Sequence, residues 1–209
     1  NGVPLLQLQL RHWIDQGQRS FVFLLHHQAG IIIELLNRQI NYFGSAVSID
    51  WVVEDKPLGT GGSVANAIHK LELTGYVLIS NADTWLDGGL KEIKSSDEAA
   101  MGVITVKNTA RFGSIILDDE FYVSKFFEKK KNPSIDARGI INAGLYKLPT
   151  NLFLEKNKVE FSLEAEILPQ ISSERLLRAV LLNGMFFDIG IPEDYYKFCD
   201  WYRVNNKNE

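Results

Sequence analysis

Short apolar segments alternate with amphipathic segments through the first half of the chain, and this alternation restricts the fold more than any other feature. Short, mainly apolar segments predict strands at residues 20–25, 47–53 and 76–80. Apolar residues at helical spacing predict helices at residues 3–17, 31–44 and 63–73. Strands and helices that alternate in this way are typical of a parallel sheet covered on both faces and joined by right-handed crossovers.

After Lys94 the chain becomes richer in strands than in helices. We expect strands at residues 99–107, 113–119, 123–130 and 140–148. Two further helices are expected, one at 162–171 with Ser162 as its N-cap and one at 191–204 with Pro192 in its first turn. The second half is therefore predicted to be mixed or antiparallel. The 209 residues suit one domain, so we expect a single domain over residues 1–209.

The charge balance argues against a nucleic acid or an anionic membrane as partner. Lys and Arg total 22 and Asp and Glu total 26, which gives a net charge of -4 and no basic field. No apolar run approaches the roughly 18 residues that a membrane-spanning helix needs. Cys199 has no second cysteine to pair with, and the 4 histidines lack the spacing of zinc ligands. We expect a cytoplasmic protein with small-molecule partners, and the sequence leaves a homodimer open.

Residues 54–62 read EDKPLGTGG and lie between an expected strand and an expected helix. In parallel sheets, ligands bind beyond the carboxyl ends of the strands. Gly59, Gly61 and Gly62 lack a β-carbon, so their backbone can approach a flat base or a phosphate, and the helix N-terminus that follows favours negative charge. The segment matches neither the P-loop nor the GxGxxG pattern. By itself it does not distinguish a binding loop from a plain turn.

Two aspartates follow apolar runs at positions where strands are expected to end. Asp83 lies in ISNADTW and Asp188 lies in MFFDIG. Each alone is an ordinary turn or capping residue. Together, two carboxylates that converge from distant positions would suit Mg²⁺, which takes one or two protein carboxylates and completes its shell with phosphate oxygens and water.

The ordered set of segments EDKPLGTGG, NAD, RFG, FFEKK, INAGLY, FSLE and FFDIGIPEDYY resembles sugar-1-phosphate nucleotidylyltransferases, the enzymes that make NDP-sugars. The resemblance covers nearly the whole chain. It implies a Rossmann-like three-layer αβα sandwich with a mostly parallel mixed central sheet and a small β-rich part that binds the sugar. It also implies Mg²⁺ and the conversion of an NTP and a sugar 1-phosphate into an NDP-sugar and pyrophosphate.

The resemblance assigns the nucleotide to Glu54, Gly59, Thr60, Gly61 and Asp83. Glu54 matches the position that reads the hydrogen-bonding edge of the base. A carboxylate only accepts hydrogen bonds, and guanine offers adjacent N1–H and N2–H donors, whereas uracil and thymine offer one N–H beside acceptors. This favours GTP, although a carboxylate can also serve a uridylyl enzyme.

The resemblance further implies that Asp83 and Asp188 bind the metal and that Asp83, Lys129 and Asp188 are the catalytic residues. Lys129 would neutralise the sugar phosphate. The expected sugar-binding residues are Gly113, Glu128, Lys129, Asn142, Gly144 and Glu164. Ala82 departs from the family, which often has glycine before the first aspartate.

A second departure is the absence of the glycine-rich loop and the PKP segment with which the family begins. We expect that this loop and a first strand are missing from the present chain. The short chain most resembles guanylyltransferases that act on D-glycero-α-D-manno-heptose 1-phosphate for capsules and surface polysaccharides. Mannose 1-phosphate guanylyltransferases and N-acetylmuramate 1-phosphate uridylyltransferases share several of its motifs. A metal-dependent glycosyltransferase and a non-catalytic regulatory subunit are alternatives of other classes.

Overall fold

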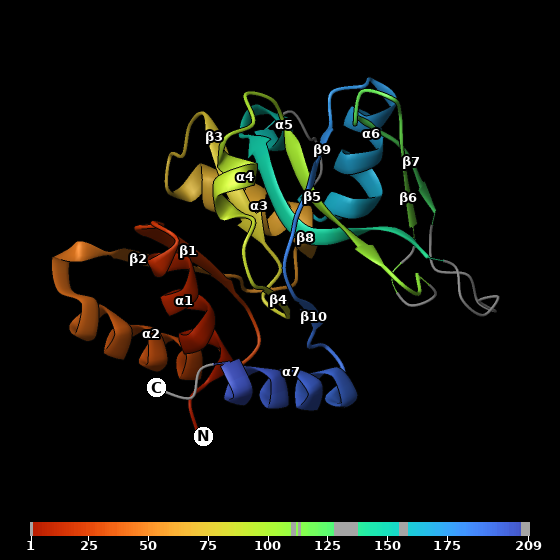
Figure 1. Cartoon of the computed structure of the whole chain (residues 1–209). Coiled ribbons are helices and arrows are strands. Elements are labelled where there is room, and N and C mark those ends of the chain that lie inside the picture. The colour runs from red at the N-terminus through yellow and green to blue at the C-terminus, as the bar shows by residue number, and fades with distance from the viewer. Residues whose placement is uncertain (1, 110–111, 113, 128–137, 155–158, 206–209) are drawn as a thin grey trace. The chain divides into compact units, whose positions relative to one another are not determined.

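The computed structural model describes residues 2–109, 112, 114–127, 138–154 and 159–205 (Figure 1). The chain divides into two compact units. Unit 1 comprises Asn1–Val77 and Leu148–Glu174, and unit 2 comprises Leu78–Lys147 and Arg175–Glu209. The expectation that all residues form a single domain stays a prediction.

Unit 1 contains two parallel strands and the three expected helices of the first half. Its elements are α1 (Leu5–Asp15), β1 (Ser20–Leu25), α2 (Ala29–Phe43), η1 (Gly44–Ala46), β2 (Ser48–Val53), α3 (Gly59–Lys70), α5 (Asn151–Leu154), η2 (Leu163–Ile167) and α6 (Leu168–Ser173). β1 and β2 pair in parallel and in register, from Ser20 opposite Ser48 to Leu25 opposite Val53. This pairing confirms the expected parallel βαβ arrangement.

The apolar faces of α1 and α2 form the core of this part of unit 1. Leu10 of α1 and Leu36 of α2 are fully buried and pack with Val47 and Ile49. Partly buried apolar residues from both helices and both strands surround this cluster, at Leu6, Ile14, Phe21, Phe23, Leu25, Ile32, Ile40, Phe43 and Trp51. The helical spacing of the apolar residues therefore predicted the buried faces correctly.

Unit 2 is built mainly on a mixed sheet. Its strands are β5 (Ala100–Val106), β6 (Ser114–Leu117), β7 (Val123–Phe127), β8 (Gly139–Pro149) and β9 (Arg178–Leu181). They follow the order β7-β6-β8-β5-β9, and β3 (Tyr76–Ser80) pairs with β8. β5 is antiparallel to β8 and parallel to β9, while β6 is antiparallel to both β7 and β8. The expected mixed sheet and α/β class are confirmed.

A second, smaller sheet in unit 2 joins β4 (Thr84–Leu86) to β10 (Phe186–Asp188) in antiparallel fashion. The helices of this unit are α4 (Leu90–Lys94) and α7 (Pro192–Asn205). Trp85 of β4 is buried against α7, with its ring centroid 4.9 Å from that of Phe198 and 5.6 Å from that of Tyr202. This aromatic contact ties the small sheet to the C-terminal helix.

The structure corrects one helix boundary and adds short elements. α3 begins at Gly59, four residues before the expected start at Ser63, so the glycine segment forms the first turn of the helix rather than a loop. β4, α4, α5 and β9 were not expected; each has three to five residues, too few for hydrophobic periodicity to show. Among the described residues, no helix is long and apolar enough to cross a membrane.

Replacing Leu36 with alanine should lower the free energy of unfolding by about 2–5 kcal/mol, because the side chain is 0% exposed and the substitution leaves a cavity. Ile31→Ala in the same helix is the matched control, since Ile31 is 64% exposed, and we expect a change below about 0.5 kcal/mol. Urea denaturation followed by circular dichroism measures both. Similar losses for the two variants would contradict the buried face assigned to α2.

Candidate functional site

The carboxylates of Asp83 and Asp188 face one small space in unit 2. Asp83 precedes β4, Asp188 ends β10, and the main-chain N–H of Ile189 donates to the carbonyl of Asp83 at 2.7 Å. A β-carbon placed on Gly190 would lie 3.2 Å from Oδ1 of Asp188 and 3.3 Å from Oδ2 of Asp83. The expected convergence of the two aspartates is therefore present in the structure.

This carboxylate pair has the chemistry of a site for a hard divalent cation. Asp83 is exposed and Asp188 is half-buried, so both can reach a solvated ion. Two carboxylates that face one space repel each other, and a cation between them would remove that repulsion. In the part of the chain that the structure describes, no group of three or more His, Cys, Asp or Glu side chains is arranged to hold a metal. The residues present thus fit Mg²⁺, which needs only one or two carboxylates from the protein.

The segment that contains Asp83 also contacts the expected sugar-binding strand β8. The main-chain N–H of Asn81 donates to the carbonyl of Gly144 at 2.9 Å. Gly144 has a φ of +71°, and a β-carbon there would lie 2.8 Å from Nδ2 of Asn81, so glycine is required on both counts. Asn142 uses its amide within the protein, accepting from Gly144 N at 2.9 Å and donating to Tyr146 Oη at 2.6 Å.

Glu54 lies at the carboxyl end of β2 in unit 1 and is only 8% exposed. Its Oε2 accepts from the main-chain N–H of Leu58 at 3.2 Å. Its Oε1 is buried and has no hydrogen-bond partner among the described residues. Burying a carboxylate oxygen without a donor costs free energy, and most such groups in folded proteins are satisfied. This oxygen can therefore accept a hydrogen bond from a donor outside the described residues.

Thr60 and Glu164, predicted to bind nucleotide and sugar respectively, are hydrogen-bonded to each other in unit 1. Thr60 Oγ1 donates to Glu164 Oε2 at 2.6 Å and accepts from the main-chain N–H of Leu163 at 2.9 Å. Ser162 Oγ also donates to Glu164 Oε2, at 3.0 Å. The same Oγ accepts from Ala165 N at 3.1 Å, which confirms Ser162 as a helix N-cap.

The glycines of the EDKPLGTGG segment have close neighbours from their own chain. The N–H groups of Gly61 and Gly62 donate to the carbonyl of Phe161 at 3.0 and 3.1 Å. A β-carbon on Gly59 would lie 2.6 Å from the same carbonyl oxygen, and one on Gly61 would overlap the Phe161 ring. The glycines thus allow the segment around Phe161 to pack on the first turn of α3. That Gly59, Thr60 and Gly61 also contact a nucleotide stays a prediction.

Three of the expected sugar-binding or catalytic residues lie outside the described residues, namely Gly113, Glu128 and Lys129. Sequence reasoning missed two structural partners of the site. Gly190 leaves open the space between the two carboxylates, and the only sequence signal for it is the glycine of DIG. Phe161 supplies the carbonyl that closes the first turn of α3, and nothing in the sequence marks it for that role.

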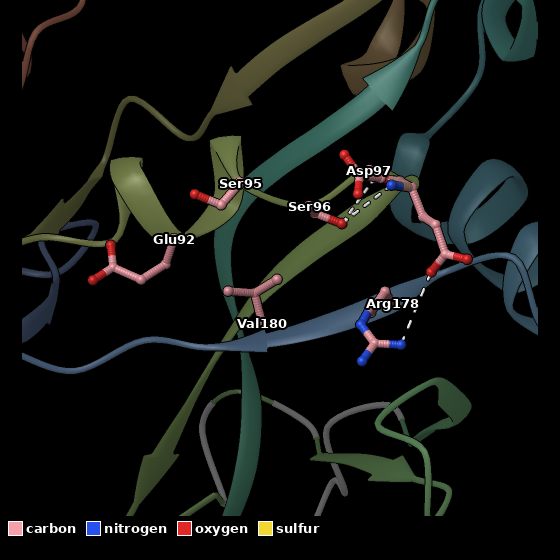
Figure 2. Close-up of a pocket in the computed structure, with 7 residues that line it drawn as sticks. Glu92, Ser95, Ser96, Asp97, Arg178 and Val180 are labelled. Carbon is pink, nitrogen blue, oxygen red and sulfur yellow. Dashed lines mark hydrogen bonds and ion pairs between the residues drawn. The ribbon is translucent and has the colours of Figure 1, made fainter.

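A depression of about 480 Å³ in unit 2 contains none of the expected site residues (Figure 2). Its lining comprises Glu92, Ser95, Ser96, Asp97, Glu98, Arg178 and Val180. Arg178 lies 4.0 Å from Glu98, so its charge is already opposed by a carboxylate. Because acidic side chains outnumber this arginine, the depression is a poor place for a phosphate.

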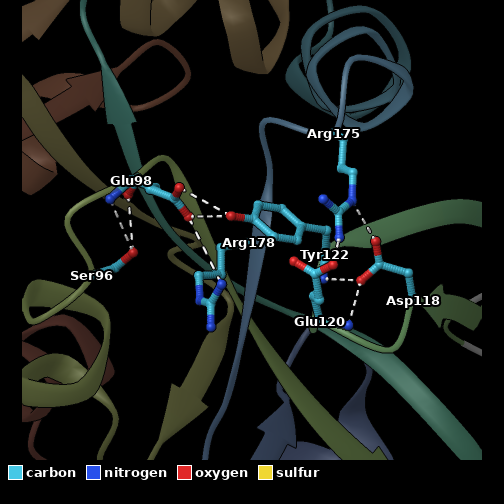
Figure 3. A network of polar contacts seen from close by, with 7 residues as sticks. All are labelled: Ser96, Glu98, Asp118, Glu120, Tyr122, Arg175 and Arg178. Carbon is cyan, nitrogen blue, oxygen red and sulfur yellow. Dashed lines mark hydrogen bonds and ion pairs between the residues drawn. The ribbon is translucent and has the colours of Figure 1, made fainter.

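The neighbouring polar network joins β9 to the turn between β6 and β7 (Figure 3). Nε of Arg175 lies 2.8 Å from Oδ2 of Asp118, and Nη2 of Arg175 lies 2.8 Å from Oε1 of Glu120. The hydrogen bond from Arg175 is the main reason why the pKa of Asp118 lies below its ordinary value. Tyr122 lies under the guanidinium groups of Arg175 and Arg178 and donates to Glu98 at 2.9 Å. The charged groups of this network pair with one another, which fits a structural role.

Comparison with known proteins adds to this geometry. Residues 1–203 match the family described as Nucleotidyl transferase. The D-glycero-alpha-D-manno-heptose 1-phosphate guanylyltransferase of Campylobacter jejuni is 28% identical over 208 residues, which covers 99% of this chain and 87% of the relative. The probable mannose-1-phosphate guanylyltransferase 1 of Oryza sativa is 28% identical over 200 residues, and the chain spans 54% of its length.

A solved structure shows the same fold. The crystal structure of HddC from Yersinia pseudotuberculosis, complexed with GMP-PN, superposes with a TM-score of 0.80. The two chains are 30% identical, and the match covers 96% of this chain and 86% of the other. This likeness confirms the expected α/β fold class independently of the strand pairing.

Replacing Gly61 with alanine should lower the free energy of unfolding by about 1–3 kcal/mol, because the added methyl group overlaps the buried Phe161 ring. Gly30→Ala makes the same change in the first turn of α2. A β-carbon at Gly30 would meet no atom of a neighbouring segment within 4 Å, so this variant should leave stability unchanged or raise it by up to about 1 kcal/mol. Thermal unfolding followed by circular dichroism compares them. Equal stability of the two variants would show that Gly61 is not closely packed.

Proposed function

Because the chain belongs to the nucleotidyl transferase family, we propose that it transfers a nucleotidyl group from a nucleoside triphosphate to a sugar 1-phosphate, giving an NDP-sugar and pyrophosphate. The convergence of Asp83 and Asp188 over Gly190 is the observation that carries this proposal. Transfer of a nucleotidyl group from one anion to another needs a cation close to the phosphates, and this carboxylate pair provides a site for one.

Asp83 and Asp188 would hold Mg²⁺ in unit 2. When bound, the ion would supply positive charge next to phosphate oxygens that become more negative during transfer. The task of the two aspartates is to fix its position, and the task of Gly190 is to leave the space in front of them open. Lys129, which lies outside the described residues, is proposed from the family resemblance to neutralise the sugar phosphate.

No residue is needed to activate the nucleophile. The second pKa of a phosphate monoester is about 6, so a sugar 1-phosphate is already mostly dianionic near neutral pH. The reaction therefore requires that the protein orient two anions in line and compensate their charge, rather than remove a proton. This requirement agrees with a site whose assigned charged groups are carboxylates and one lysine.

We assign guanine as the preferred base. Oε1 of Glu54 is a buried acceptor that lacks a donor among the described residues, and Oε2 lies beside it. Guanine presents two adjacent N–H donors to such a carboxylate, whereas uracil would place an acceptor against it. The names of the Campylobacter and rice relatives, both guanylyltransferases, support the same base.

The proposed sugar substrate is D-glycero-α-D-manno-heptose 1-phosphate, which is the substrate named for the Campylobacter relative. Asn142, Gly144 and Glu164 are proposed to contact the sugar. Oε1 of Glu164 is the atom assigned to a sugar hydroxyl, because the hydrogen bonds from Thr60 and Ser162 both go to Oε2. Mannose 1-phosphate is the alternative, after the rice relative. We place the reaction in the cytoplasm, since a single cysteine suits a reducing compartment.

The test is a grid of nucleoside triphosphates against sugar 1-phosphates, with Mg²⁺ and with pyrophosphate release as the readout. We expect the highest rate for GTP with the heptose 1-phosphate. Turnover of UTP with inert GTP would overturn the assignment of Glu54. Transfer of sugar from a nucleotide sugar to an acceptor, without pyrophosphate release from any pair, would identify a glycosyltransferase instead.

Replacing Glu54 with glutamine should lower kcat/KM for GTP by about 10–100-fold, because an amide N–H₂ then faces the N–H donors of guanine. The variant should not unfold at a lower temperature, since the lost oxygen has no partner among the described residues. Asp55→Asn is the matched control, because it removes one negative charge from the adjacent, exposed residue. A loss of GTP turnover in both variants would point to local charge rather than to base reading.

Replacing Asp188 with asparagine should lower kcat by about a hundredfold or more and weaken binding of Mn²⁺, used as a probe for Mg²⁺, in electron paramagnetic resonance titrations. Asp87→Asn is the control, because it removes the same charge from an exposed residue immediately after β4 that does not face Asp188 across Gly190. This variant should leave kcat and Mn²⁺ affinity unchanged. Unaltered Mn²⁺ affinity in the Asp188→Asn protein would contradict the proposed cation site.

A further inference from the structure

His26 directly follows β1 and lies opposite Glu54, which directly follows β2. The parallel register pairs Leu25 with Val53, so His26 and Glu54 come next at the carboxyl ends of the two strands. Nδ1 of His26 lies 3.0 Å from the main-chain oxygen of Glu54. A carbonyl oxygen can only accept, so Nδ1 carries the hydrogen and donates it.

This bond replaces the next bond of the parallel ladder. The last ladder bond runs from the N–H of Glu54 to the carbonyl of Leu25, at 2.8 Å. If the ladder continued, the N–H of His27 would donate to the carbonyl of Glu54. Among the described backbone hydrogen bonds there is none between these two residues, because the chain turns into α2 through Gln28 at a φ of +55°. The imidazole ring therefore satisfies the carbonyl at the point where the strand pair ends.

Glu54 is consequently fixed at three of its polar groups by three different residues. Its N–H is bound to Leu25, its carbonyl to His26 and its Oε2 to Leu58. Only Oε1 has no partner among the described residues. An acceptor that must meet two adjacent donors of a flat base needs this kind of support, because hydrogen bonds weaken steeply when distance and angle depart from their optimum.

We propose that His26 is a positioning residue for base selection. It holds the main chain of Glu54 so that the carboxylate meets both the N1–H and the N2–H of guanine. This inference rests on the proposed function, in which Glu54 reads guanine, and adds to it a residue that does not contact the substrate. Loss of the hydrogen bond donated by His26 would let the main chain at Glu54 shift. The contact of the Glu54 carboxylate to the N2–H of guanine would then weaken most.

GTP and ITP isolate that second contact, because hypoxanthine keeps N1–H and lacks the 2-amino group of guanine. The dissociation constants of both nucleotides are measured by isothermal titration calorimetry on the whole chain, with kcat and KM where turnover is found. His26→Leu removes the donor and introduces an apolar side chain of similar size. His26→Asn keeps an N–H donor at nearly the position of Nδ1. His27→Leu changes the neighbouring, exposed histidine as the control.

We expect His26→Leu to weaken GTP binding about fivefold and ITP binding less, so that the preference for GTP over ITP falls about threefold. His26→Asn should restore most of that preference, and His27→Leu should leave it unchanged. The rise in KM for GTP should exceed any fall in kcat, because His26 is not assigned to the phosphates. A purely structural defect would weaken both nucleotides alike.

Three results would overturn the inference: an unchanged GTP to ITP ratio in His26→Leu, an impairment in His26→Asn as large as that in His26→Leu, or an equal effect of His27→Leu. Each of these leaves GTP binding by the unaltered protein intact, so the proposed function would stand. Failure of the proposed base is seen differently, as absence of guanine-nucleotide binding by the unaltered protein, and it would overturn the role of His26 as well.

Discussion

The antiparallel pairing of β4 with β10 is the constraint on which the candidate cation site depends. Asp83 and Asp188 are distant in sequence and meet only because these two three-residue strands lie side by side. A pair this short is not stable by itself. Its support is the aromatic packing of Trp85 against α7, which buries apolar area behind the strands. The spacing of the two carboxylates is therefore set by residues that have no chemical role in transfer.

Both candidate binding features work against the stability of the unliganded chain. The carboxylates of Asp83 and Asp188 repel each other, and Oε1 of Glu54 is buried without a donor among the described residues. Such groups are uncommon in folded proteins and often mark functional sites, because each costs free energy while it is unpaired. A cation would relieve the first and the N–H groups of a base would relieve the second. Ligands that bind only the folded state also stabilise it, so both features should couple ligand binding to stability.

The sequence predicted the parts of the fold that periodicity records and missed those that tertiary pairing sets. The helices α1, α2 and α7 and the strands β1, β2, β5 and β8 follow from apolar spacing. β4 and β9 do not, because strands of three or four residues acquire their conformation from the neighbours with which they pair. For the site, the family resemblance pointed to Asp83 and Asp188. It did not point to Gly190, which lacks a β-carbon that would lie against both carboxylates, or to His26, which forms a hydrogen bond to the main-chain oxygen of Glu54.

The glycines of EDKPLGTGG show why a motif and its physical cause must be separated. Read from the sequence, they indicate a backbone that a ligand can approach closely. In the structure, the neighbours that come close are the carbonyl and ring of Phe161, and this packing brings Thr60 within hydrogen-bond distance of Glu164. A β-carbon at Gly61 would therefore disturb the packing and the position of Glu164 together. Lost activity in such a variant would not demonstrate contact with a nucleotide. A side-chain change at Thr60 leaves the bonds of Gly61 and Gly62 to Phe161 in place and tests the two hydrogen bonds of Thr60 Oγ1, to Glu164 and to Leu163.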